Sequence, residues 1–306
     1  MIHVHAADVG IGVHEPLGPA LARIAAGQFD RITAGLRMNP DRDAAVHDAR
    51  KALKRLRALL RLVRGHLSED VFREEDVVLR DLGRHLAEAR DARTRIDTLA
   101  ALAPDRCEVL QEHLIHDHRA VSALLLTDTD LMGQILTTTK CARERWATHL
   151  PGLVRDEFAA ISPGLRRTYR RGRKRMGRAV GHPSDEAFHE WRKEVKYLRY
   201  QMESLRPIDP LAFGGVIAAL ASLGEVLGTE HDHTVLGSAV IRDGGCDGEA
   251  AHVLELLQAR KKGLRISAVP LATRVYSGKS GRFIRRIGER WEAAREGPAG
   301  VRGGRR

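Results

Sequence analysis

The sequence predicts an all-α protein, and three features of this chain of 306 residues indicate that class. Its apolar residues, mainly Leu and Ala, recur with the period of an amphipathic helix along almost the whole chain. Runs of β-branched residues are short, and no stretch alternates apolar and polar residues as a half-buried strand does. Apolar residues make up 43% of the chain, so it can bury a core and is not a disordered tail.

Turn-forming residues divide this helical pattern into segments. The breaks fall near Pro40, Pro104, Pro183 and Gly244, each among other turn residues. In chain order, helices are expected over residues 16–36, 43–65, 70–102, 106–126, 141–175, 184–206, 210–228 and 248–266, with a last one near 280–296. Residues 293–306, rich in Gly and Arg, are expected to form a flexible basic tail.

Composition excludes several classes of protein. Cys107, Cys141 and Cys246 are too far apart for CxxC pairs, which argues against a disulfide framework or a thiolate zinc site. The N-terminus lacks the basic and apolar regions of a signal peptide. We find no apolar run of 18 residues, so we expect no membrane span and no membrane partner. We therefore expect a cytoplasmic protein.

The positive charge, a net +11, is concentrated in particular segments. Residues 166–178 carry eight Arg or Lys and no acidic residue, and residues 279–306 are also strongly basic. The rest of the chain is close to neutral. This distribution favours a localised anionic partner over a generally cationic surface.

An internal repeat is the most informative feature. Residues 47–57 (HDARKALKRLR) overlie 189–199 (HEWRKEVKYLR) at an offset of 142, and six positions are identical. Residues 81–91 overlie 222–232 at an offset of 141, which pairs Asp91 with Asp232. Two blocks at almost the same offset predict two similar helical halves, 16–150 and 151–292.

Each copy of the first block places cations on one side of a helix. At about 100° per residue, the first helix gathers its cations within an arc of about 100°, with Arg57 and Arg64 at the margin. The members of that arc are His47, Arg50, Lys51, Lys54 and Arg61. Leucines occupy the opposite side. The second copy repeats the arrangement with His189, Arg192, Lys193, Lys196 and Arg199.

Such a ridge of cations favours an anionic ligand. Like charges at i,i+3 and i,i+4 of a helix repel one another. We expect few acidic side chains on the same face to relieve this repulsion, because Asp48 and Glu190 are expected to point elsewhere. Arg forks fit phosphate oxygens, Lys adds charge, and a leading His can donate to phosphate. The alternative is an ordinary solvated face, but recurrence in both halves favours ligand binding. Asp91 and Asp232 are expected to orient cations or cap helices, without a catalytic role.

These motifs resemble those of the CHAD family, the conserved histidine α-helical domain, over residues 16–292. The pattern H-x-x-R-K-x-x-K-x-L-R occurs twice, each followed by L-x-x-x-x-D, and a basic run at 169–174 precedes the second copy. The resemblance implies two antiparallel four-helix bundles, related by a pseudo-two-fold axis, around a basic central channel. It also implies binding of inorganic polyphosphate and, in bacteria, association with polyphosphate granules.

Carried over position by position, the resemblance implies a set of polyphosphate ligands. In the first half they are His47, Arg50, Lys51, Lys54, Arg55 and Arg57, and in the second half they are His189, Arg192, Lys193, Lys196 and Arg199. Arg166, Arg170, Arg173 and Lys174 would continue the lining of the channel. Two positions depart from the repeat, because Tyr197 lies opposite Arg55 and His231 lies opposite Arg90. The E-x-E-x-K signature of a triphosphate tunnel domain is missing from the sequence.

Two other functions compete with polyphosphate binding. A nucleic-acid binder would also use cations, but it usually interleaves them with aromatic rings, and residues 47–64 contain none. By angle, Trp191 and Tyr200 are expected to pack in the core. A metal-dependent phosphohydrolase could use the histidines at 113, 116, 118, 231 and 233, although neither group has a second acidic motif at a convincing distance.

We therefore predict a protein that binds inorganic polyphosphate without being an enzyme and without a cofactor. Polyphosphate-metabolising or granule proteins are further expected partners, and nucleic acid is not expected to be one.

Overall fold

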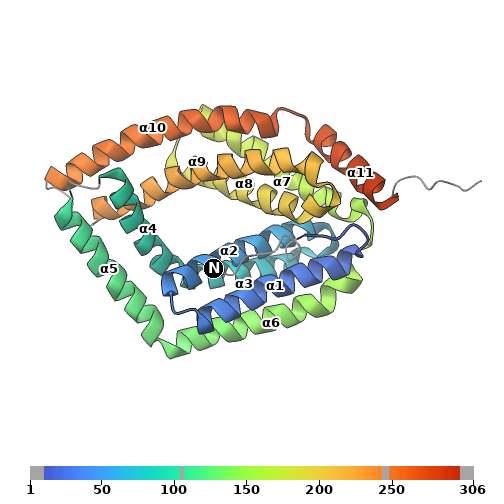
Figure 1. The fold of residues 1–306 in the computed structure, drawn as a ribbon, viewed down its shortest axis with the longest axis horizontal. Coiled ribbons are helices and arrows are strands. Elements are labelled where there is room, and N and C mark those ends of the chain that lie inside the picture. Colours follow the sequence, from blue (N-terminus) through green and yellow to red (C-terminus); the bar gives the residue numbers. More distant parts are fainter. Residues whose placement is uncertain (1–9, 104–106, 243–247, 297–306) are drawn as a thin grey trace, which may run out of the picture.

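The computed structural model confirms the all-α prediction (Figure 1). It describes residues 10–103, 107–242 and 248–296, and no strand occurs among them. The α-helices are α1 (Leu17–Met38), α2 (Arg42–Leu62), α3 (Glu69–His85), α4 (Ala87–Leu102), α5 (Glu108–Thr127), α6 (Thr129–Leu153), α7 (Phe158–Gly181), α8 (Asp185–Leu205), α9 (Pro210–Arg242), α10 (Gly248–Tyr276) and α11 (Ser280–Glu296). Two 3₁₀ turns, η2 (Arg64–His66) and η3 (Arg206–Ile208), follow α2 and α8.

Two of the expected helices are each divided in the structure. The segment 70–102 bends at Leu86, whose φ of −95° and ψ of 1° end α3 and whose side chain is fully buried. The segment 141–175 is broken after Leu153, and α6 begins at Thr129, well before the expected start. In that second break Asp156 accepts a hydrogen bond from the backbone N–H of Leu17 at 2.9 Å. The second break directly follows Pro151 and Gly152, two turn-forming residues inside the segment that was expected to be one helix, whereas neither Gly nor Pro occupies position 86.

Two helices end beyond their expected boundaries, and one expected tail overlaps a helix. Helix α9 continues to Arg242 and α10 to Tyr276, so both are longer than predicted. Helix α11 ends at Glu296, as expected, so it includes the first residues of the tail predicted at 293–306, and residues 297–306 lie outside the described part of the chain. Cys246 also lies outside it.

The helices lie in a row across the molecule, with the two repeated helices at its centre (Figure 1). Helix α1 packs against α6 and α2, α2 packs against α8, and α8 packs against α7 and α9. Trp191 and Leu198 of α8 and Leu56 of α2 are fully buried in the main core. The Gln201 amide donates to the carbonyl of Ala58 at 3.0 Å, which joins the two repeated helices directly.

Helix α9 corrects the expectation that the sequence contains no apolar run long enough to span a membrane. By length and composition it is apolar enough to span a bilayer, and it is the one such helix among the described residues. Its C-terminal half, however, carries Glu230, His231 and Asp232, and the helix packs against α8 and α10. Length and composition alone are therefore weak evidence for a span.

Candidate functional site

The two repeated helices bring their central cations together. Arg50 and Lys54 lie on α2, and Arg192 and Lys196 lie on α8. These four residues form what we call the inner basic cluster. Arg192 acts electrostatically on both lysines, Arg50 acts on Arg192, and Lys54 acts on Lys196. The sequence repeat therefore corresponds to a spatial pairing of matched residues.

The second repeated block supplies an acid to each half of the cluster. Asp91 of α4 lies 3.6 Å from the Arg50 guanidinium, which also donates to the carbonyl of Gly83 at 3.2 Å. Asp232 of α9 acts on Arg192 and Lys196. Both acids lie inside their helices, so they orient cations, as expected, and do not cap helix ends.

Burial and mutual repulsion leave the cluster short of negative charge. Burial, followed by the charges of Arg192 and Arg50, lowers the pKa of Lys54 to about 7. Burial, followed by Arg192 and Lys54, lowers the pKa of Lys196 to about 6. Among the described residues, Lys54, Arg192 and Lys196 have no carboxylate within ion-pair distance. The buried Nε atoms of Arg50 and Arg192 have no hydrogen-bond partner, and buried donors of this kind favour a bound acceptor.

A pair of histidines lies beside the cluster. The Nδ1 atoms of His189 and His231 are 3.3 Å apart, so one ring nitrogen donates and the other accepts. Burial first, and then neighbouring cations, lower the pKa of His189 to about 4 and that of His231 to about 3. Both rings are therefore neutral near pH 7. His47, the counterpart of His189 in the first half, is exposed.

Several other predicted ligands are already paired with acids. Asp76 of α3 binds Arg57 at 2.9 Å and Arg61 at 3.0 Å. Glu203 binds Arg55 at 3.2 Å and Arg199 at 2.7 Å. The expectation of few acids along the ridge is therefore wrong, because tertiary packing brings Asp76 from another helix.

Two further predicted ligands lie at the edge of the ridge. Lys193 pairs with Glu190, which also lies 3.5 Å from Arg175, so the expectation that Glu190 points elsewhere is also wrong. Lys51 is exposed on α2.

Sequence reasoning missed the position of two residues near the cluster. Tyr200 was expected to pack in the core, but it is only half-buried, with the Arg55 guanidinium 5.3 Å from its ring centre. Trp191, by contrast, is fully buried, as expected. Arg90 was not assigned a role, yet it acts on His47, Arg50 and Lys54. Its position next to Asp91 in the repeated block was the signal that could have identified it.

The four cations predicted as ligands on the basic helix before the second repeat lie outside the inner basic cluster. Arg166, Arg170, Arg173 and Lys174 are all exposed on α7. The same helix directs Arg171 toward Glu194 of α8 at 2.8 Å and Arg175 toward Glu190. The structure therefore does not bring these four residues into the inner basic cluster.

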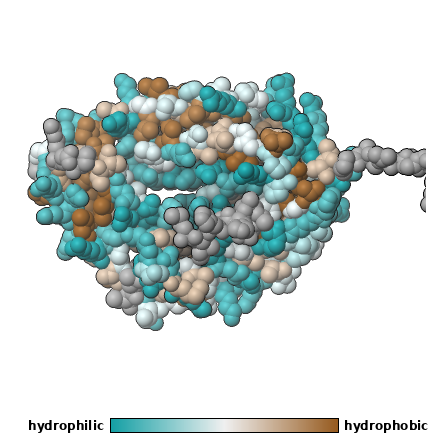
Figure 2. Space-filling model, in the orientation of Figure 1, coloured by the Kyte–Doolittle hydropathy of each residue, from teal (hydrophilic) through white to brown (hydrophobic). Residues whose placement is uncertain are grey.

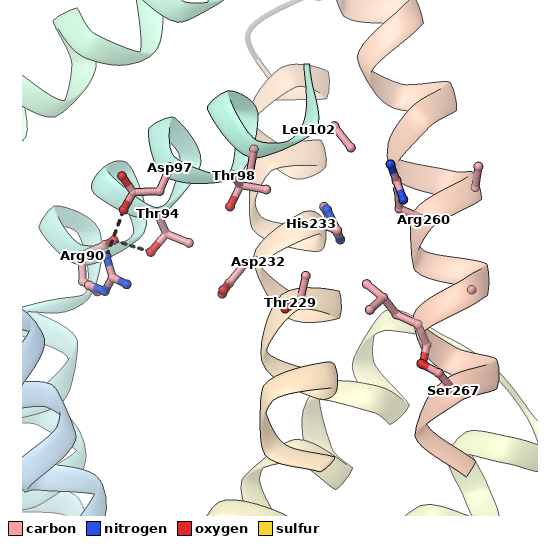
Figure 3. Close-up of a pocket in the computed structure, with 14 residues that line it drawn as sticks. Arg90, Thr94, Asp97, Thr98, Leu102, Thr229, Asp232, His233, Arg260 and Ser267 are labelled. Atoms are coloured by element: carbon pink, nitrogen blue, oxygen red, sulfur yellow. Dashed lines mark hydrogen bonds and ion pairs between the residues drawn. The ribbon is translucent and has the colours of Figure 1, made fainter. Parts of the chain in front are cut away.

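A cavity of about 720 Å³ lies next to the cluster, between α4, α9 and α10 (Figure 3). Arg90 and Asp232 line it and also act on the cluster, so the two are neighbours. The space-filling view shows the molecule hollowed beside α4, with mainly hydrophilic residues around the opening (Figure 2).

The histidines considered as metal ligands are dispersed. His118 binds Asp43 at 2.9 Å and Ser122 at 3.3 Å. His113 lies 3.9 Å from Asp117 on its own helix. His231 and His233 lie apart from both, on α9. Within the described ranges, no three His, Cys, Asp or Glu side chains are grouped as a metal site.

Comparison with known proteins identifies the family. The crystal structure of the CHAD domain from the plant Ricinus communis is similar over 95% of this chain and 96% of that one, with a TM-score of 0.63 and 19% identity. PptA from Streptomyces chartreusis is similar over 86% of this chain and 100% of that one, with a TM-score of 0.60 and 19% identity. At this identity the likeness shows the shared fold. No curated protein matches the chain. The family model of the CHAD domain matches residues 21–240, and the chain therefore belongs to the CHAD family, as its repeated motif predicted.

Proposed function

We propose that this protein binds inorganic polyphosphate, without turning it over, at the inner basic cluster. The observation that carries the proposal is the group of partly buried cations on α2 and α8, of which Lys54, Arg192 and Lys196 have no carboxylate within ion-pair distance among the described residues. An anionic chain supplies the missing charge, and Arg groups hold phosphate oxygens through paired N–H donors. Polyphosphate binding is also the known role of the family to which the chain belongs.

The aromatic rings near the cluster favour polyphosphate over nucleic acid. The Arg61 guanidinium covers the ring of Tyr197 at 4.3 Å, and Arg55 lies over Tyr200. Both rings therefore already have a cation on one face. Single-stranded nucleic-acid sites gain about 1–3 kcal/mol from each base stacked on an aromatic ring, and polyphosphate needs no such platform.

The cavity between α4, α9 and α10 gives the ligand a way to continue past the cluster. Arg90 borders both spaces and adds a further cation. A flexible chain with one charge per phosphate can follow this route, because its backbone has no bulky side groups. We place the protein in the cytoplasm, at polyphosphate granules, with granule or polyphosphate-metabolising proteins as further partners.

Paired substitutions in the cluster test the proposal. We expect Arg50→Gln with Lys54→Gln, and separately Arg192→Gln with Lys196→Gln, to weaken binding of defined-length polyphosphate by more than about tenfold. The matched control, Arg37→Gln with Arg119→Gln, removes two exposed cations and should change affinity far less. Isothermal titration measures the affinity, and circular dichroism shows that the helices remain.

Two outcomes would overturn the proposal. One is unchanged affinity in both cluster variants. The other is displacement of bound polyphosphate by RNA at an equal phosphate concentration. Release of orthophosphate by the pure protein with Mg²⁺ or Mn²⁺ would contradict its non-enzymatic part.

A further inference from the structure

The outer face of α7 carries a separate row of cations. Arg166, Arg170, Arg173 and Lys174 lie within an arc of about 100° and extend over about 12 Å of helix. All four are exposed, and none has an ion pair among the described residues. Helix α7 itself contains no Asp or Glu. We call these four residues the outer basic row.

The row rests on a firmly packed helix. Tyr169 donates to the carbonyl of Gly278 at 2.9 Å, and its ring stacks on Phe283 at 4.3 Å. Arg173 also donates to the Gly278 carbonyl, at 3.4 Å. These contacts fix the turn between α10 and α11 against α7. Lys279, exposed and next to Gly278, adds a fifth cation beside the row.

Two ion pairs separate this row from the inner basic cluster. Arg171 binds Glu194 and Arg175 binds Glu190 where α7 meets α8. Around α8, Arg192 and Lys196 point about 120° or more away from those two glutamates. Around α7, Arg166 and Arg173 lie on the side opposite Arg171 and Arg175. The row and the inner basic cluster therefore face different sides of the α7–α8 contact.

The chemistry of the row fits an extended polyanion without bases. Its cations repel one another at i,i+3 and i,i+4 spacing, so a row of phosphates relieves the repulsion. Tyr169, the helix's single tyrosine, is buried and offers no stacking surface. Val180 is the one large apolar side chain of α7 that is exposed, so the face lacks the apolar surface with which a helix enters a bilayer.

We propose that the outer basic row is a second polyphosphate site, independent of the inner basic cluster. The inference rests on the proposed function and adds to it that each protein molecule binds polyphosphate at two sites. With two separate sites, one molecule joins two polyphosphate chains or two distant segments of one long chain.

Titration with a short polyphosphate of defined length tests the second site. The wild-type protein should bind two chains. The variant Arg166→Gln, Arg170→Gln, Arg173→Gln and Lys174→Gln should bind one chain, and its remaining site should change in affinity by less than about twofold because the two groups share no partner. The matched control, Arg37→Gln, Arg119→Gln, Lys140→Gln and Lys262→Gln, removes four exposed cations elsewhere and should still bind two.

The outcomes separate this inference from the function on which it rests. If the α7 variant keeps the wild-type stoichiometry, or if the control loses a chain equally, the second site does not exist, while the inner site stands. If the inner-cluster variants bind as tightly and as many chains as the wild type, the proposed function fails. RNA that occupies the outer row as tightly as polyphosphate would overturn its assignment to polyphosphate.

Discussion

Two partly buried lysines determine how ligand binding and stability are expected to depend on pH. Burial, followed by the charge of Arg192, lowers the pKa of Lys54 to about 7 and that of Lys196 to about 6. The sequence predicted both residues, because the repeat places them at matched positions. It could not predict Asp76 as the partner of Arg57 and Arg61, since that contact depends on how α3 packs.

The first prediction concerns the pH dependence of binding. A polyanion raises the pKa of each lysine from about 7 and about 6, so binding takes up protons and the affinity increases as the pH falls from 8 to 6. Titrations in buffers of different ionisation enthalpy measure the uptake. Affinity that is constant over this range would contradict the assignment of these lysines as ligands.

The second prediction concerns stability without ligand. Unfolding returns both lysines to the ordinary pKa of 10.5, so between about pH 7 and 10 the unfolded state binds more protons and stability increases with pH. Replacement of Lys54 and Lys196 by Met removes this dependence and raises the melting temperature at pH 7. Melting curves of the wild type and of the double variant, recorded at pH 7 and pH 9, test this prediction. A double variant that melts lower than the wild type at pH 7 would show that the lysines stabilise the fold.

At the scale of helices, the sequence predicted α2 and α8 closely but not every break. The repeated helices have strong periodicity and side-chain caps at Asp41 and Ser184, which are visible in the sequence. Periodicity alone joined helices that the structure separates, because no Gly or Pro occupies the division at Leu86 and because Pro151 and Gly152, which precede the break after Leu153, were not used as breaks. Helix α9 was predicted too short because its C-terminal half contains charged residues and histidines.

The third prediction tests the close contact between α7 and α2. A Cβ atom on Gly164 would lie 2.1 Å from the Leu62 carbonyl oxygen, which belongs to the backbone and cannot turn aside. We expect Gly164→Ala to lower the free energy of unfolding by about 1–3 kcal/mol. Urea denaturation measures the change.

Gly177 provides the control on the same helix. Nothing lies within 4 Å of its added Cβ, so Gly177→Ala should stabilise the protein by about 0.4–1 kcal/mol. Equal effects of the two substitutions would contradict the close approach of α7 to α2.

At the scale of the whole molecule, the internal repeat links sequence to site. The helices that carry the first block, α2 and α8, pack together, and those that carry Asp91 and Asp232 lie beside them. The all-α class and the repeat followed from the sequence, and the resemblance to the CHAD family implied that both repeated helices contribute to one basic channel. The position of the outer basic row did not follow from either, because a run of cations on one helix does not reveal which side faces its neighbours.

The central claim is that both repeated helices grip one polyphosphate segment. A crystal structure with a short polyphosphate of defined length tests it most directly. We predict consecutive phosphates in contact with both Arg50 of α2 and Arg192 of α8. Phosphates bound on the surface alone, with the space between these two guanidinium groups empty of ligand, would contradict the claim.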